Sequence, residues 1–185
     1  FLFWLLLLGI SLHVISKRDR GLFNPANTDE LTGLYNRRAY EEGLDRIRKD
    51  VPSEKMIVVA IFDVNGLKEV NDKLGHASGD ELLRGAASTI RSVYGSYGKC
   101  YRTGGDEFVV ILEEPVEKLS VLNENFEKAA AKWHGKQVAE LNISYGAALS
   151  EEVCSIDEQI ILADQRMYFA KKAYYQKIGK DRRNY

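Results

Sequence analysis

The sequence predicts an α+β fold in which a mostly antiparallel sheet is flanked by helices. Three observations lead to this prediction: segments with apolar residues at helical spacing, short continuous apolar runs rich in β-branched residues, and a glycine pair between two strand-like segments. Helical and strand-like segments mix along the chain with a hairpin among them, which is typical of an antiparallel sheet packed against helices. The chain has 185 residues, 45% of them hydrophobic and 29% charged, which suits one folded domain.

The N-terminal segment is strongly apolar and carries no charged side chain before Lys17. A membrane-spanning helix needs about 20 apolar residues, and the chain opens on Phe1 without a methionine. We therefore expect residues 1–16 to be the end of a transmembrane helix that starts upstream. Lys17, Arg18 and Arg20 follow directly, so the positive-inside rule places the remainder in the cytoplasm, at the inner face of the cytoplasmic membrane. A buried helix of a soluble domain is the alternative interpretation.

A polar linker and one compact domain follow this segment. Residues 17–28 form the predicted juxtamembrane linker, in which Pro25 acts as a breaker, and residues 29–185 form the domain. The first helix is predicted over residues 36–50, where apolar side chains recur at helical spacing. The run MIVVAIFDV over residues 56–64 is continuous, apolar and rich in β-branched residues, so it suits a central strand.

The middle of the domain is predicted as a helix followed by a hairpin. Ser78 and Glu81 form a capping-box pattern, which predicts a helix over residues 78–93. Gly104-Gly105 is a strong turn signal because glycine adopts positive φ without steric cost. The apolar run FVVIL over residues 108–112 then forms the second strand of the hairpin.

The last three elements are predicted as helix, strand and helix. Apolar residues repeat at intervals of three and four over residues 119–133 and again over residues 160–170, which indicates two helices. They alternate with other residues over the segment AELNISYGAAL, residues 139–149, which indicates a strand. The two cysteines, Cys100 and Cys154, follow no metal-binding spacing and are interpreted as small core residues.

Three carboxylates are predicted to meet where the central strand ends. Asp63 ends the strand segment MIVVAIFD, residues 56–63, and Asp106 and Glu107 lie at the tip of the hairpin. Two adjacent ionised carboxylates repel each other by roughly 4 kcal/mol at 4 Å and an effective dielectric of 20, so a cation, a basic partner or solvent must offset the repulsion. Carboxylate oxygens suit Mg²⁺, which could then bind phosphate oxygens. An exposed acidic hairpin tip without a function is the alternative.

The same residues carry a resemblance to a known family, the GGDEF-domain diguanylate cyclases. The motif GGDEF stands at residues 104–108, and the resemblance extends over about residues 29–172. The supporting segments are DELTGLYNRRAY at 29–40, FDVNGLKEVNDKLGHASGDELL at 62–83, NISYGAAL at 142–149 and ADQRMYFAKK at 163–172. The resemblance implies a fold akin to polymerase palms and class III nucleotide cyclases, and a reaction that condenses two GTP into cyclic di-GMP and two pyrophosphates.

The resemblance also implies the metal-binding and catalytic residues. The side chain of Asp63 and the carbonyl of Val64 resemble the family's metal ligands, for two ions of Mg²⁺ or Mn²⁺. Asp106 resembles the residue that binds metal and acts as base for the 3′-hydroxyl, and Glu107 is the adjacent acid of the same metal site. Lys68 resembles the lysine that neutralises phosphate charge; a solvated helix lysine is the alternative.

A further set of residues is implied to bind the substrate. Asn71 and Asp80 resemble the pair that reads guanine, because a carboxylate accepts from the base's N1–H and amino group. His76 matches a position of the nucleotide site, and a loop histidine without a catalytic task is the alternative. Lys171 fits the family's late lysine. The Gly-Arg-Asn that follows it in the family comes several residues late here, so Arg182 is a candidate phosphate ligand only.

The sequence also departs from the family where many members bind their product. An Arg-x-x-Asp site is common there, whereas this chain carries GSYG at residues 95–98. A cyclic dinucleotide needs arginine to bind its phosphates in a bidentate manner. We therefore expect no feedback inhibition through this site.

These expectations define one function and its rivals. The expected protein is a membrane-bound sensor's signalling output domain, a diguanylate cyclase that binds GTP and works as a homodimer. A catalytically silent GTP-binding or scaffold module is the alternative. A formal net charge of −1 disfavours a polymerase-like domain acting on nucleic acid, which would need a basic surface. The length leaves no room for a second, phosphodiesterase domain.

Overall fold

The computed structural model describes residues 25–49, 56–112 and 119–179. The predicted transmembrane segment, most of the predicted linker and Arg182 lie outside these described residues. Within the described ranges, none of the helices combines the length and the apolarity that crossing a bilayer requires.

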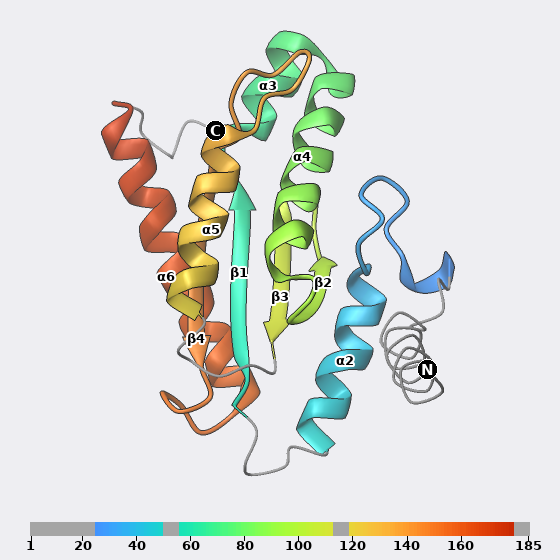
Figure 1. Cartoon of the computed structure of the whole chain (residues 1–185), viewed down its shortest axis with the longest axis vertical. Coiled ribbons are helices and arrows are strands. Elements are labelled where there is room, and N and C mark those ends of the chain that lie inside the picture. Colours follow the sequence, from blue (N-terminus) through green and yellow to red (C-terminus); the bar gives the residue numbers. More distant parts are fainter. Residues whose placement is uncertain (1–24, 50–55, 113–118, 180–185) are drawn as a thin grey trace, which may run out of the picture.

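The elements form a four-stranded sheet with helices on both faces (Figure 1). In chain order they are η1 (Pro25–Asn27), α2 (Arg37–Lys49), β1 (Val58–Val64), α3 (Leu67–Leu74), α4 (His76–Tyr94), β2 (Gly98–Arg102), β3 (Glu107–Leu112), α5 (Leu119–Lys132), β4 (Ile143–Leu149) and α6 (Ile156–Lys177). The strand order is β2-β3-β1-β4, and all three neighbouring pairs are antiparallel. The predicted α+β fold with an antiparallel sheet is therefore confirmed.

The position of strand β1 in the sheet explains why its sequence is a continuous apolar run. Its residues Val58, Ala60 and Phe62 pack on one face of the sheet, against α4 and α5. Its residues Val59 and Ile61 pack on the other face, against α2 and α6. Because both faces of this central strand are covered, every one of its seven residues is buried.

The register of the sheet decides which polar side chains meet at its end. Asp63 lies opposite Glu107 on β3 and opposite Ser144 on β4. Residues directly opposite each other in antiparallel strands project to the same face of the sheet. The amide of Val64 donates to the carbonyl of Asp106 at 3.0 Å, which joins the hairpin tip to the end of β1.

Helix α4 begins earlier than the capping-box pattern predicted. Its N-cap is Gly75 at φ 83°, with no side-chain cap, and its first residue is His76. The Ser78 hydroxyl instead donates to the carbonyl of Leu74 and to the side-chain oxygen of Gln137. The Glu81 carboxylate accepts from a loop far along the chain. The capping-box interpretation was therefore wrong, because tertiary partners take both side chains.

Two further expectations were corrected. In the described part of the chain, positive φ occurs at four glycines, and neither Gly104 nor Gly105 is among them. The hairpin turn is closed by the amide of Thr103, which donates to the carbonyl of Glu107 at 3.1 Å. Cys100 is a core residue as predicted, whereas Cys154 is exposed.

Candidate active site

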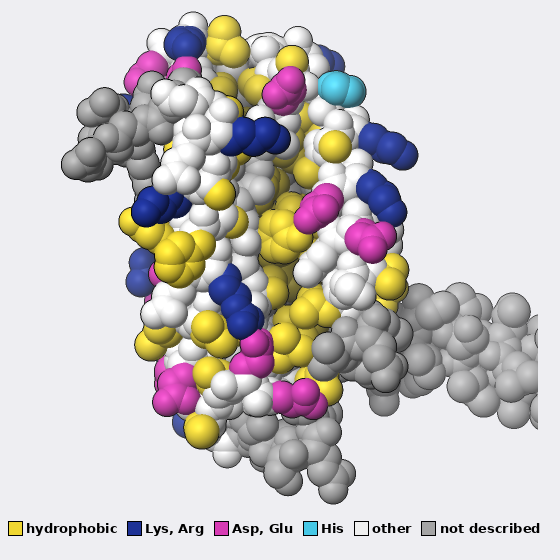
Figure 2. Space-filling model, turned by 90° about the vertical axis from the view of Figure 1, so that its left-hand side faces the viewer, with side chains coloured by type: hydrophobic (Ala, Val, Ile, Leu, Met, Phe, Trp, Pro, Cys, Tyr) yellow, Lys and Arg dark blue, Asp and Glu magenta, His cyan; other side chains and the backbone are white. Residues whose placement is uncertain are grey.

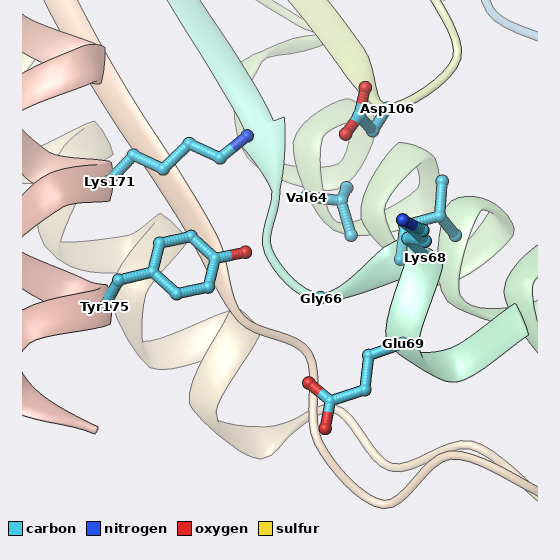
Figure 3. Close-up of a pocket in the computed structure, with 8 residues that line it drawn as sticks. Val64, Gly66, Lys68, Glu69, Asp106, Lys171 and Tyr175 are labelled. Atoms are coloured by element: carbon cyan, nitrogen blue, oxygen red, sulfur yellow. The ribbon is translucent and has the colours of Figure 1, made fainter. Parts of the chain in front are cut away.

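A pocket of about 190 Å³ opens where β1 ends and α3 begins (Figure 3). It is lined by Val64, Gly66, Leu67, Lys68, Glu69, Asp106, Lys171 and Tyr175. Lys171 and Tyr175 project from α6 on one side, and Asp106 lies on the other side with Lys68 (Figure 3). The structure thus brings four predicted site residues, Val64, Lys68, Asp106 and Lys171, around one pocket.

A sharp turn after β1 places α3 at the rim of this pocket. Gly66 has φ 76° and ψ 13°, a left-handed conformation that a residue with a side chain adopts only at a cost. The chain therefore turns directly from β1 into α3, a helix of eight residues. Lys68 lies in the first turn of that helix, where backbone N–H groups lack helical partners and favour anionic ligands.

Asp63 and Lys171 form a buried ion pair beside the pocket. The Lys171 Nζ donates to Asp63 Oδ1 at 2.5 Å and to Oδ2 at 2.6 Å. Only 7% of the Asp63 side chain and 13% of the Lys171 side chain are exposed. The residues are 108 positions apart, so the pairing depends on α6 crossing the end of β1.

Asp63 also lies in an acidic neighbourhood. Burial raises the pKa of its carboxyl, the ammonium of Lys171 opposes this, and the negative charges of Asp106 and Glu107 raise the pKa further. Glu107 is exposed and faces Asp63 across the strand pair. The negative charges of Asp106 and Glu107 therefore act on the carboxyl of Asp63.

An arginine on β2 supports the hairpin that carries Asp106. Arg102 donates from Nη2 to the carbonyl of Gly105 at 2.8 Å, and from Nη1 to both oxygens of Asp29 at 3.1 and 3.2 Å. Thr32 donates to the same carboxylate through its amide at 2.9 Å and its hydroxyl at 2.6 Å. The opening segment of the domain therefore anchors the hairpin turn.

The predicted guanine-reading residues lie outside the pocket, on α3 and α4. Asn71 of α3 packs so closely on α4 that a Cβ added at Gly79 would lie 2.0 Å from Asn71 Oδ1. Asp80 follows Gly79 directly, and its Oδ2 lies 3.7 Å from Arg84 Nη2. His76 is exposed at the start of α4. Their substrate contacts remain a prediction.

The donor set suits a divalent ion in its chemistry. The carboxylates of Asp63, Asp106 and Glu107 supply hard oxygen ligands, and the carboxylate of Asp63 already contacts one cation, the ammonium of Lys171. Within the described residues, however, no three acidic, histidine or cysteine side chains converge on one point. Binding a divalent ion at Asp63 would therefore require the ammonium to move away.

Tyr175 and Arg102 belong to this region of the structure and were not predicted from the sequence. Tyr175 lies one helical turn after Lys171, and residues four positions apart share a helix face, so this spacing would have identified it. Arg102 precedes the Gly-Gly turn, and its partner Asp29 is 73 residues away, which spacing alone does not reveal.

The fold and the pocket together define an α+β domain that gathers carboxylates and lysines at one end of its central strand. The chain belongs to the family described as diguanylate cyclase, GGDEF domain, whose model matches residues 26–177. This membership confirms the family that the sequence motifs indicated.

Two known proteins are similar to this chain over most of its length. Diguanylate cyclase DgcN of Escherichia coli K12 is 31% identical over 170 residues, which are 89% of this chain and 41% of that protein. An uncharacterized membrane protein of Staphylococcus aureus USA300 is 30% identical over 129 residues, which are 66% of this chain and 36% of that protein. The chain thus spans less than half the length of these relatives.

A solved structure supports the fold. The crystal structure of the GGDEF domain of DgcB from Caulobacter crescentus in complex with c-di-GMP superimposes with a TM-score of 0.71 at 27% identity. The match covers 80% of this chain and 91% of that chain.

Proposed function

We propose that the chain is a diguanylate cyclase domain that condenses two GTP into cyclic di-GMP and two pyrophosphates. The observation that carries the proposal is the pocket at the end of β1, which places Asp106 opposite Lys171 with Lys68 at its rim. A triphosphate needs cationic groups to neutralise its charge, and an attacking hydroxyl needs a base. The membership in the GGDEF family and the similarity to DgcN support the same activity.

The proposed chemistry assigns one task to each group. The 3′-oxygen of one GTP bonds to the α-phosphorus of the other, and the bond from that phosphorus to the β-phosphate bridging oxygen breaks. The carboxylate of Asp106 takes the hydroxyl proton, and Lys68 and Lys171 neutralise the triphosphate. Two Mg²⁺ or Mn²⁺ ions, held by Asp63, the Val64 carbonyl, Asp106 and Glu107, would make the hydroxyl more acidic and stabilise the leaving pyrophosphate.

Guanine recognition is assigned to the two helices beside the pocket. The Asp80 carboxylate accepts from N1–H and the amino group of the base, and the Asn71 amide meets its remaining polar edge. His76 and, beyond the described residues, Arg182 are further candidates for substrate contacts.

The reaction as proposed needs two copies of the chain, because each bound GTP attacks the other. A homodimer that presents two pockets to each other satisfies this requirement. The apolar N-terminal segment, followed by basic residues, supports a cytoplasmic domain tethered to the membrane, and one relative carries a membrane-protein name.

The surface disfavours the nucleic-acid rival. Figure 2 shows acidic and basic side chains interspersed on the face that it presents, with no continuous stripe of lysine and arginine. A net charge of −1 and the mixed charges on this face argue against a basic nucleic-acid-binding surface there.

Replacing the proposed base tests the activity. Asp106→Asn keeps the size of the side chain but removes the basic carboxylate, so cyclic di-GMP formation from GTP and Mg²⁺ should fall about 10²-fold or more. Asp164→Asn, an exposed acid on α6 away from the pocket, is the matched control and should leave the rate unchanged. Chromatographic detection of cyclic di-GMP gives the measurement.

The same assay separates the cyclase from the silent module. A parent chain that binds GTP with micromolar affinity but makes no more product than Asp106→Asn would support the GTP-binding or scaffold alternative. Binding is measured independently by calorimetry with a non-hydrolysable GTP analogue.

A further inference from the structure

The ion pair between Lys171 and Asp63 has a consequence for the order in which ligands bind. We propose that the Lys171 ammonium occupies the cation position at Asp63, that a divalent ion displaces it, and that the displaced ammonium then binds the triphosphate. This inference rests on the proposed function, because it concerns the metal and the nucleotide of that same site. It makes Lys171 a device that couples the binding of the two ligands.

The ammonium of Lys171 contacts both oxygens of the Asp63 carboxylate, at 2.5 and 2.6 Å. Both side chains are almost entirely shielded from water, with 13% and 7% exposure. Two cations in contact with one carboxylate would repel each other, and burial weakens the screening of that repulsion. A divalent ion and the ammonium therefore exclude each other at Asp63.

The displaced ammonium can move into the pocket that Lys171 lines. Lys171 lines the pocket together with Lys68 and Tyr175, and its flexible stem of four methylene groups ends next to that cavity (Figure 3). A change of side-chain rotamer on a fixed helix α6 moves Nζ from Asp63 into the pocket. The acids that remain near Asp63, namely Asp106 and Glu107, then face a divalent ion instead of a lysine.

Coupling follows from this exchange. A divalent ion that binds alone must push the ammonium out of a buried ion pair into a pocket without an anion. A nucleotide supplies the anion, so the ion and the nucleotide should each tighten the binding of the other by the same factor. Removing the ammonium should tighten binding of the ion alone and abolish most of this coupling.

The first experiment measures Mn²⁺ binding without turnover. Free Mn²⁺ is followed by electron paramagnetic resonance at pH 8, with and without a non-hydrolysable GTP analogue, on residues 1–185 in detergent. Lys171→Met should bind Mn²⁺ alone about tenfold more tightly than the parent and should show little further gain with the analogue. Lys172→Met removes an exposed lysine next in the chain and should behave as the parent does. Unchanged or weaker Mn²⁺ binding by Lys171→Met overturns the proposal.

A second experiment uses the parent chain, so it stands even where Lys171→Met does not fold. Reductive methylation of Lys171, quantified by mass spectrometry, should be slow without metal because the ammonium is buried. It should become several-fold faster with saturating Mg²⁺ alone, and slow again when the analogue is added. Equal reactivity with and without saturating Mg²⁺ overturns the proposal.

These outcomes are independent of the cyclase assay. A chain that exchanges lysine for metal but makes no cyclic di-GMP retains the inference and loses the proposed activity. A chain that makes cyclic di-GMP while Lys171 keeps its reactivity retains the activity and loses the inference.

Discussion

Gly79 lies where α4 passes the side chain of Asn71. A Cβ at this position would lie 2.0 Å from Asn71 Oδ1 and 2.9 Å from its Cγ, which no packing tolerates. Gly79→Ala should therefore push Asn71 away from its present position. We expect a loss of about 1–3 kcal/mol in the free energy of unfolding and a roughly tenfold rise in KM for GTP, which corresponds to about 1.4 kcal/mol. Chemical denaturation and steady-state kinetics measure the two effects.

A double-mutant cycle provides the control. In the Asn71→Ala background the obstructing amide is absent, so adding Gly79→Ala should cost less stability than it does in the parent. If Gly79→Ala costs the same in both backgrounds, the contact with Asn71 is not what requires a glycine. Leu67 Cδ1, 3.2 Å from the added Cβ, would then be the obstacle to examine.

For single residues, the sequence predicted which side chains belong to the site better than it predicted which side chains contact each other. Asp106, Lys68 and Lys171 were predicted for one site, and they line one pocket. The direct contact between Lys171 and Asp63 was not predictable from spacing, because 108 residues separate them and only the packing of α6 on β1 joins them. Glu81 fitted a local cap pattern, but it bonds to a distant loop.

At the scale of elements, the hairpin between β2 and β3 depends on Arg102. Its guanidinium joins the Gly105 carbonyl to the carboxylate of Asp29, and 14% of the side chain is exposed. Arg102→Met removes these bonds and leaves Asp29 partly buried with fewer donors. We expect a loss of about 2–3 kcal/mol in the free energy of unfolding and a lower kcat, because the turn that positions Asp106 is released. Urea denaturation and kinetics check both.

The matched control is an exposed arginine with a similar ion pair. Arg38 bonds to Glu42 at 2.9 Å, with 65% of its side chain exposed, and such pairs contribute little. Arg38→Met should therefore lie within about 0.5 kcal/mol of the parent. Equal destabilisation by the two variants would contradict the role given to Arg102.

A carboxylate on α4 binds three backbone N–H groups of the loop after α5. Glu81 accepts from the backbone N–H groups of Lys136, Gln137 and Val138, at 2.7, 2.8 and 3.1 Å. These donors hold the pKa of Glu81 below its ordinary range, with the Lys136 amide contributing most. A carboxylate with a lowered pKa stabilises the fold above its unfolded pKa, and this contribution is lost as the pH falls through the folded pKa.

Glu81→Gln should therefore lower Tm by a few degrees at pH 7. The Tm difference from the parent should narrow as the pH falls below about 4.3, the ordinary glutamate pKa, since the parent then loses the same charge. Thermal unfolding by circular dichroism between pH 7 and pH 3 makes the comparison, with Glu140→Gln, an exposed acid, as control. A Tm difference that stays constant over this range would show that charge does not hold the loop.

The bounds of the helices and strands were predicted best where the pattern of apolar residues was strongest. Strand β1 was predicted over residues 56–64 and spans Val58–Val64, because its β-branched run is buried on both faces. Helix α4 was predicted two residues too short at its start, because glycine geometry at Gly75 and not a side-chain cap begins it. The turn at Gly104-Gly105 was placed correctly, but neither glycine has the positive φ angle that was expected there.

At the scale of the whole molecule, the sequence predicted the fold class and the mixture of elements. It could not predict the strand order β2-β3-β1-β4, because β1 pairs with β3 and β4, which lie far from it in the sequence. That order makes β1 central and brings Asp63 between β3 and β4, under α6. The candidate nucleotide pocket lies within one chain, whereas the proposed reaction consumes two nucleotides.

The requirement for two pockets gives a test with mixed chains. Asp106→Asn retains the lysines and the helices that are proposed to bind GTP, so it should still pair with the parent while lacking the base. If both pockets of a dimer must work, a tenfold excess of Asp106→Asn should trap most parent chains in inactive pairs. The rate of cyclic di-GMP formation per parent chain should then fall about tenfold, as random pairing requires. An equal mass of serum albumin is the control for crowding. A rate per parent chain that does not change when the variant is added would show that one chain completes the reaction by itself.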